Sequence, residues 1–478
     1  MAFDFSEVFF SSISEVNAGL RAKKYSAEEL TRAFCDRLEK VGPRYNALAL
    51  SMRQEALRKA RAVDDELKRD RLRGPLQGIP YAVKDLLAVK GGPTTWGAQP
   101  FAGQVFDEDA FIVQKLTRAG AILVGKLAMV ELAGGGGYRY ASASMFGPGK
   151  NPWDSSKWSG GSSSGPGSAV AAGLVTFALG SETSGSIITP SAFCGVTGLR
   201  PTYGLVSRRG AMALSWTLDK IGPMCRSVED CALVLHEIAG KDAEDPGSAN
   251  RSYSYSSKYS RNPKDITVGY APVDFAEWTD PQARPAFQAA LEVVKGFGVR
   301  LKEVELPDFP YGSMTELIIA AEAGSIFEDI IRDGRVDRLA DQKQIAGLKA
   351  SLDVPAIEYM RAMRVRRLVQ EKLNDLFLDV DLLLTPARFA PAPNISDPLD
   401  VSARPAPPRP AERGLSGIIP AGNLAGLPAI SMPCGFAGTL PLGISLVGRP
   451  FSENLLVSVG RMFQSQTDWH KRHPMVGS

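Results

Sequence analysis

The sequence predicts an α/β fold, in which helices pack on a central sheet whose strands are mostly parallel or mixed in direction. Two observations support this prediction. Helix-type and strand-type hydrophobic patterns alternate along the 478 residues, and several short apolar runs have the composition of buried strands. The length exceeds that of a usual single domain, so it fits either one very large α/β domain or two domains.

The N-terminal part of the chain contains three predicted helices and a strand. Ser26 and Glu29 have the spacing of a capping box and open the first of these helices. A second helix is predicted from Ser51 to about Lys68, and a third from Ala110 to Arg118. The run Ala121 to Val124 then has the pattern of a buried strand.

The central and C-terminal parts continue the alternation. The Ala-rich run after Gly167 predicts a tightly packed helix, followed by a strand from Val175 to Leu179. Residues 241–264 are rich in Ser, Asn, Asp and Tyr, and we expect a surface linker there. The remaining predicted elements are a strand (266–270), a helix (285–295), a strand (299–304), a long helical stretch (311–378), a Pro-rich loop (386–410) and a helix–strand–strand unit formed by NLAGLPAISMPCG and LPLGISLVG.

Composition excludes several classes of protein. Apolar residues make up 44% and charged residues 22% of the chain, and the net charge is +3 without a basic block. We therefore expect a globular protein that binds neither nucleic acid nor membranes. The five cysteines are scattered without a CxxC pair, which argues against a zinc site and favours reduced thiols in the cytoplasm. We find neither a signal-peptide pattern nor an apolar run long enough to cross a membrane.

Two Gly/Ser-rich segments form the most informative feature. GGSSSGPG begins at Gly160 and GSETSGS ends at Ser186, while GIPYAVKD places Lys84 in a short apolar run. The chain has three histidines, and none lies in either segment. A serine nucleophile here needs a different base, and a lysine whose pKa is lowered by burial meets that need.

Three other segments resemble motifs of different chemistry. Gly120 to Lys126 fits a phosphate-binding loop except at its last position, where Leu127 replaces the Ser or Thr that binds magnesium. GSSSG around Ser163 fits a nucleophile elbow, but that interpretation requires His236, which has the spacing of a partly buried helix residue. Cys194 lacks a nearby histidine, and we expect it to be a small, buried and inert residue.

The chain resembles the amidase signature family, hydrolases of carbon–nitrogen bonds. The similar motifs are GIPYAVKD, AGAILVGK, FGPGKNPWD, both Gly/Ser segments, GLRPTYGLVSRRG, SWTLDKIGPM, SVEDCALVLHEIAG, LLLTP, NLAGLPAISMPCG and LPLGISLVG. The resemblance covers most of residues 15–465 and is weakest from about 245 to 375. It implies one α/β/α domain over residues 1–478, built around a large mixed, twisted sheet of about eleven strands. It also implies that a variable helical region, about 305–375, and a Pro-rich loop, 386–415, build most of the substrate pocket.

The resemblance also implies the catalytic residues. Lys84 is the base, Ser162 the bridging serine on a cis peptide bond, and Ser186 the nucleophile. Backbone N–H groups of Thr183, Ser184, Gly185 and Ser186 would stabilise the oxyanion. Neither a metal nor another cofactor is required by this mechanism.

Several positions depart from the family pattern. Ser164 and Ser184 stand where glycine is usual. Glu182 replaces the usual aspartate and Ile188 a typical arginine, so the sequence leaves open which residue pairs with Glu182.

The loop AGGGGYRY aligns with a stretch that lines the acyl pocket in the family. Its residues Gly136, Gly137 and Tyr138, together with Ile188, are therefore our predicted substrate-binding residues. The four successive glycines suggest either a mobile, open pocket wall or a flexible surface turn.

Two classes of function follow from the resemblance. The first is a stand-alone amidase, monomeric or homodimeric, acting on neutral hydrophobic or aryl amides, with carbamates (urethanes) and esters as related substrates. The second is the glutaminase A subunit of a tRNA-dependent amidotransferase complex. Ile188 and the YRY sequence of the glycine loop favour the first class, because they depart from the pattern of that subunit.

Overall fold

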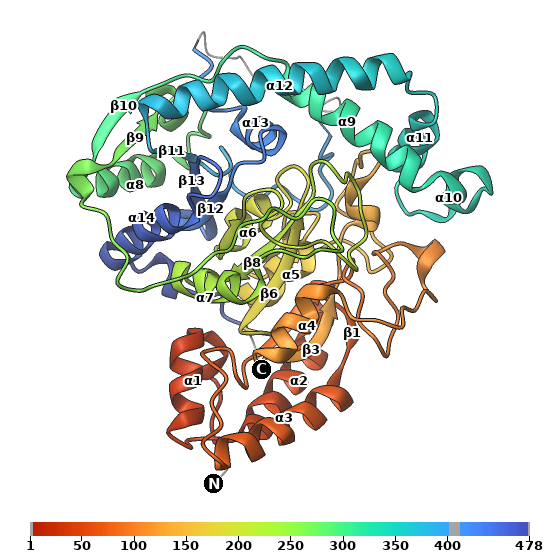
Figure 1. Cartoon of the computed structure of the whole chain (residues 1–478), viewed down its shortest axis with the longest axis vertical. Helices are drawn as coiled ribbons and strands as arrows, with labels where there is room; N and C mark the ends of the chain where they lie inside the picture. The colour runs from red at the N-terminus through yellow and green to blue at the C-terminus, as the bar shows by residue number, and fades with distance from the viewer. Residues whose placement is uncertain (1–2, 401–411, 477–478) are drawn as a thin grey trace.

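The computed structural model describes residues 3–400 and 412–476 and is dominated by one large sheet (Figure 1). Eleven strands form it in the order β1-β3-β2-β6-β8-β7-β12-β13-β11-β9-β10, and β4 and β5 form a separate pair. The strands of the chain are β1 Leu48–Ser51, β2 Pro80–Lys84, β3 Ile122–Leu127, β4 Lys150–Asn151, β5 Asp154–Trp158, β6 Phe177–Glu182, β7 Thr197–Arg200, β8 Lys220–Cys225, β9 Thr267–Tyr270, β10 Arg300–Glu303, β11 Leu382–Pro386, β12 Ala429–Ala437 and β13 Leu440–Gly448.

The sheet is mixed, as predicted. Strand β2 runs parallel to both β3 and β6, and β9 runs parallel to β10 and β11. The centre is antiparallel, from β6 through β8, β7, β12 and β13 to β11. The predicted α/β class with a large mixed sheet is therefore confirmed.

Helices surround the sheet. Figure 1 shows α1 to α3 at one end of the molecule and α9 to α12 at the opposite end, with the strands between them. The helices are α1 Ile13–Arg21, α2 Ala27–Val41, α3 Arg53–Lys68, α4 Phe111–Arg118, α5 Ser164–Ala171, α6 Ile188–Cys194, α7 Val228–Ile238, α8 Arg284–Gly296, α9 Tyr311–Ile326, α10 Glu328–Arg332, α11 Gln342–Ser351, α12 Ala356–Asp379, α13 Ile418–Leu424 and α14 Glu453–Gln466.

Local signals predicted several of these elements well. The capping box at the start of α2 is confirmed, because the Ser26 hydroxyl accepts from the Glu29 N–H and the Glu29 carboxylate accepts from the Ser26 N–H. The helix predicted from Ser51 begins at Arg53 instead, because Ser51 ends β1 and pairs with Gly125 of β3. The long helical stretch is divided into four helices, α9 to α12.

One boundary bears directly on the site. The strand predicted from Val175 to Leu179 is β6, which starts at Phe177 and continues to Glu182. Its last residues pair with the start of β8, where Glu182 lies opposite Lys220. Ser181 and Glu182 are consequently held in the sheet, directly before the second Gly/Ser segment.

Part of the Pro-rich loop lies outside the described residues, namely 401–411. Residues 387–400 form neither a helix nor a strand, in agreement with the sequence prediction.

Candidate active site

Lys84 ends β2 in the interior of the protein. Its side chain is fully buried, and β2 lies between β3 and β6 in the sheet. The Lys84 Nζ donates hydrogen bonds to the Ser162 hydroxyl at 2.7 Å and to the Ser181 hydroxyl at 2.9 Å. The structure thus joins Lys84 to the first Gly/Ser segment, as the sequence predicts.

Ser181 is a polar partner of Lys84 that the sequence analysis missed. The predicted strand ends at Leu179, which leaves Ser181 in the second Gly/Ser segment, whereas β6 continues to Glu182. Strand β6 pairs in parallel with β2, with Ala82 opposite Ala178 and Val83 opposite Leu179. Extending the strand by one alternation would have brought Ser181 into consideration.

The environment of Lys84 favours its neutral form. Burial lowers its pKa to about 7, although the negative charges of Asp219 and Glu182 oppose this shift. Near neutral pH a substantial fraction of the amine is therefore unprotonated and able to accept a proton.

Ser162 follows a cis peptide bond with Gly161, as the family resemblance implies. Its neighbour Ser163 is wholly buried and has a different role. The Ser163 hydroxyl donates to the Ser181 carbonyl oxygen and accepts from the Ser181 N–H, both at 3.2 Å. Ser163 therefore fastens the first Gly/Ser segment to β6, which disfavours the nucleophile-elbow interpretation.

Ser186 lies on the loop between β6 and α6. It keeps 9% of its surface exposed, and its hydroxyl makes no hydrogen bond within residues 3–400 and 412–476. The segment before Ser162 packs closely on α6, because a Cβ added at Gly160 would lie 2.6 Å from the Cα of Pro190. The structure therefore brings the two Gly/Ser segments together without a hydrogen bond between Ser162 and Ser186 in the described part of the chain.

The four predicted oxyanion donors occupy this same loop. In the described part of the chain, none of the N–H groups of residues 183–186 donates a hydrogen bond. Gly185 has a φ of +89°, a conformation that favours glycine. The Thr183 hydroxyl donates to Asp219 at 2.6 Å, which anchors the start of the loop. The loop thus carries unused N–H donors beside the Ser186 hydroxyl.

The partner of Glu182, which the sequence left open, is Arg200. Its Nη1 donates to the Glu182 carboxylate at 2.7 Å, and both side chains are buried. Burial alone would raise the pKa of Glu182, but the charges of Arg200 and Lys220 and hydrogen bonds from Asn423 and Arg200 lower it to about 2. Glu182 is therefore ionised at neutral pH.

A cavity of about 530 Å³ lies next to Ser181 and Thr183. Leu86, Ala133, Ser181 and Thr183 contribute to its wall, and the other lining residues come from the ranges 203–221 and 244–247. Neither Ser162 nor Ser186 lines this cavity, so the expectation that residues 305–375 and 386–415 supply most of the substrate pocket stays a prediction. The loop after β7 lies beside residues 183–186 and is tied to them through Asp219.

The wall of this cavity is partly apolar, with Leu86, Met212, Leu214 and Trp216 among its residues. Its arginines are paired. Arg208 Nη2 lies 3.4 Å from Asp245, while Arg209 contacts Asp242 at 3.0 Å and Glu244 at 3.3 Å.

The predicted substrate-binding residues have different surroundings. Gly136 packs against α11, and a Cβ there would lie 2.6 Å from the Gln344 carbonyl oxygen. Gly137 is exposed, and a Cβ there would meet nothing closer than 3.9 Å. Close backbone packing at Gly136 thus accounts for part of this glycine run, in place of an open wall.

Tyr138 and Ile188 also lie in different surroundings. A Cβ added at Gly161 would lie 3.3 Å from the Tyr138 hydroxyl, so this hydroxyl approaches the cis peptide bond. Ile188 is only 1% exposed and packs with Leu218 and Leu424 in a hydrophobic cluster. Ile188 is not among the residues that line the 530 Å³ cavity, and its role in substrate binding stays a prediction.

The other three motif-like segments have structural explanations. Lys126 lies in β3 and forms a buried ion pair with Asp85 at 2.7 Å, so it does not belong to a phosphate-binding loop. His236 is exposed on α7, more than the sequence predicted. Cys194 is buried, its thiol donates to the Ser159 carbonyl oxygen, and burial raises its pKa.

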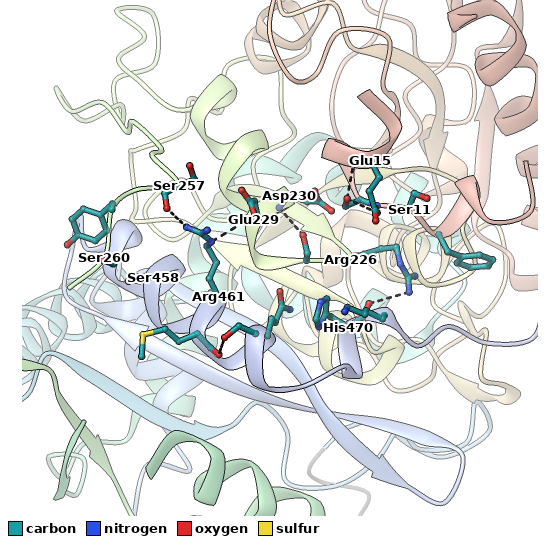
Figure 2. Close-up of a pocket in the computed structure, with 18 of the residues that line it drawn as sticks. Ser11, Glu15, Arg226, Glu229, Asp230, Ser257, Ser260, Ser458, Arg461 and His470 are labelled. Atoms are coloured by element: carbon teal, nitrogen blue, oxygen red, sulfur yellow. Dashed lines mark hydrogen bonds and ion pairs between the residues drawn. The ribbon is translucent and has the colours of Figure 1, made fainter. Parts of the chain in front are cut away.

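A second cavity, of about 780 Å³, lies between α1, α7 and α14 (Figure 2). Arg226 and Arg461 line it together with Glu15, Glu229 and Asp230, as the close-up shows. None of the predicted catalytic, oxyanion or substrate-binding residues borders this cavity.

Residues 3–400 and 412–476 contain no cluster of three or more His, Cys, Asp or Glu side chains able to hold a metal ion. None of the helices in this part of the chain is long and apolar enough to span a membrane.

A family profile and the sequence of a known protein both match most of this chain. The Amidase family profile matches residues 29–457. The A subunit of glutamyl-tRNA(Gln) amidotransferase from Carboxydothermus hydrogenoformans is 37% identical to this chain, over 98% of this chain and 100% of that protein.

Solved structures also superpose on most of this chain. A chain from a complex described as revealing the evolutionary origins of an s-triazine catabolic enzyme superposes with a TM-score of 0.86 at 30% identity, covering 95% of this chain and 98% of its own. The peptide amidase of Stenotrophomonas maltophilia gives 0.84 at 29% identity, covering 99% of both chains.

Proposed function

Since the chain belongs to the amidase signature family of carbon–nitrogen hydrolases, we propose that it cleaves amide bonds by transferring the acyl group to Ser186. The observation that carries this proposal is the buried Lys84 amine, 2.7 Å from the Ser162 hydroxyl beside a loop of unused N–H donors. No histidine is required, because the lowered pKa of Lys84 provides the base.

In the proposed reaction, Lys84 accepts the Ser162 proton while Ser162 accepts the proton of Ser186. The Ser186 Oγ forms a bond to the substrate carbonyl carbon, and the loop N–H groups stabilise the oxyanion, an effect worth about 3–4 kcal/mol per donor. Collapse breaks the C–N bond, and Ser162 returns a proton to the leaving nitrogen. Water then hydrolyses the acyl-serine and regenerates both hydroxyl groups.

Two acyl donors are supported by different observations. The 37% identity over the whole length of an amidotransferase A subunit supports glutamine as the donor, with this chain acting in a complex. These relatives favour that alternative over the stand-alone amidase expected from the sequence.

The site itself supports the second candidate, a neutral hydrophobic or aryl amide. Glutamine carries two charges that a protein must pair. The arginines that line the 530 Å³ cavity are already paired with carboxylates, and Ile188 replaces the family arginine. Carbamates and esters belong to the same group, because the acyl-serine route accommodates them.

A substrate panel distinguishes the two candidates. The purified chain is assayed with glutamine, an aliphatic amide, a neutral anilide, an aryl carbamate and an aryl ester. If the stand-alone proposal is correct, kcat/KM is highest for a neutral substrate. A higher kcat/KM for glutamine supports the glutaminase instead.

A second experiment tests the complex directly. The tagged chain is co-expressed with B and C subunits of a tRNA-dependent amidotransferase, and the purified material is assayed for glutaminase activity. Co-purification in fixed stoichiometry with a large rise in glutamine turnover supports the A-subunit function. Purification of the chain alone, with unchanged turnover of a neutral amide, supports the stand-alone amidase.

A further inference from the structure

The carboxylate of Glu182 closes the oxyanion loop into a ring. Glu182 directly precedes the loop, and its Oε2 accepts the N–H groups of Ile187 at 2.9 Å and Ile188 at 3.0 Å, directly after it. Its Oε1 accepts from Arg200 Nη1 at 2.7 Å and from Asn423 Nδ2 at 2.9 Å. One buried side chain therefore fixes the distance between the two ends of residues 183–186.

This arrangement depends on a counter-ion. An unpaired carboxylate in the protein interior is strongly unfavourable and would become protonated. The family pattern has an arginine at position 188, whereas Ile188 here is apolar and packed in the core. The positive charge must come from another residue.

Arg200 supplies that charge from β7. Its Nε donates to the Leu427 carbonyl oxygen at 3.0 Å, and the residue pairs with Ala429 of β12. A Cβ at Gly422 would lie 2.9 Å from the Arg200 Nη2, so the glycine leaves room for the guanidinium. Strand pairing and the backbone of α13 therefore hold the guanidinium in one place.

Lys220 is the other cation near Glu182, and it is a weaker partner. It lies opposite Glu182 in the sheet, but its Nζ donates to the Leu218 carbonyl oxygen. Burial and the neighbouring Arg200 charge lower the pKa of Lys220. A guanidinium, by contrast, keeps its proton in proteins.

We propose that Arg200 is a positioning residue for the oxyanion loop, acting through Glu182 in place of the arginine that the family has at position 188. The longer Glu182 side chain, compared with the family aspartate, reaches β7. This inference rests on the proposed function, because it assigns the loop the task of stabilising an oxyanion.

The proposal predicts a specific kinetic change. Arg200→Met and Arg200→Lys are expected to lower kcat for 4-nitrophenyl butyrate by about 10- to 100-fold, the range that follows from weakening one or more oxyanion donors. KM is expected to change less than about threefold, because the ground-state ester makes less use of these donors. The rate of Ser186 labelling by a fluorophosphonate is expected to fall in parallel with kcat.

A rescue variant separates positioning from general stability. Glu182→Asp/Ile188→Arg/Arg200→Met places the family's aspartate and arginine at positions 182 and 188, and its kcat is expected to be at least about tenfold higher than that of Arg200→Met. Arg53→Met, which removes a half-buried arginine paired with Glu39 far from the site, serves as the control and should leave kcat unchanged. The melting temperature of each variant is measured in the same buffer.

The outcomes are distinct. Retention of kcat in a folded Arg200→Met or Arg200→Lys variant overturns the proposal. A triple variant whose kcat is no higher than that of Arg200→Met also overturns it. If Arg200→Met does not fold, kcat is measured for Arg200→Lys and Glu182→Gln instead, and retention of kcat in either variant overturns the proposal. A wild-type protein that neither turns over the ester nor reacts with the fluorophosphonate would instead contradict the proposed function.

Discussion

Lys84 and Ser162 meet through a 2.7 Å hydrogen bond that joins the end of β2 to the serine of a cis peptide bond. The lysine is buried by strands on both sides, and burial is the main cause of its low pKa. Burial thus favours the neutral form of Lys84, and the contact would give the proposed proton transfer from Ser162 a direct path.

The identity of the nucleophile can be tested with two serines. Ser186→Ala should abolish turnover and prevent labelling by a fluorophosphonate, since its hydroxyl lies beside the unused N–H donors. Ser163→Ala should keep the labelling, because Ser163 is bonded to β6. Labelling that survives Ser186→Ala and disappears in Ser163→Ala would support the nucleophile elbow.

The pH dependence of activity should report Lys84. Its pKa of about 7 means that the amine becomes a free base as the pH rises through that value. We expect kcat/KM to be low in acid and to rise to a plateau on the alkaline side. Lys84→Arg should be inactive, since guanidinium stays protonated. A larger loss in His236→Ala than in Lys84→Ala would require a histidine mechanism.

The buried ion pair between Lys126 and Asp85 should be essential for stability. Both side chains are almost fully buried, so Lys126→Met leaves an unpaired carboxylate. We expect the free energy of unfolding, measured by urea denaturation, to fall by about 3–5 kcal/mol. Asp85→Asn/Lys126→Met should lose less than the two single changes together. The control Arg332→Ala breaks an exposed helix pair and should change stability by less than about 1 kcal/mol.

Two neighbouring glycines provide a matched test of the glycine loop. Gly136 and Gly137 have φ values of +81° and +74°, so alanine adds similar backbone strain at each. At Gly136 the new Cβ would also clash with α11, whereas at Gly137 its nearest neighbour would be the Lys343 Cε at 3.9 Å, an ordinary contact. Gly136→Ala should therefore lower the melting temperature clearly more than Gly137→Ala. Equal effects would contradict the close packing against α11.

The sequence could predict those features that depend on local pattern. The capping box of α2 is formed by residues three apart, and the alternation of helix and strand patterns indicated the α/β class. The Lys84 contact with Ser162 was predicted because the family motifs around both residues are present. The predicted strand ends three residues before β6 does, because Gly180 and the polar residues after it interrupt the apolar pattern while strand pairing continues.

By itself, the sequence determined the fold class, the family, and the residues proposed for catalysis. Only the tertiary structure decided that Arg200 pairs with Glu182, that Ile188 is a core residue, and which segments line the 530 Å³ cavity. Glu182 and Arg200 lie on strands that are separated in the sheet by β8. A buried charge selects its partner by proximity across such neighbouring strands, and the order of strands in a sheet is not written in any local stretch of sequence.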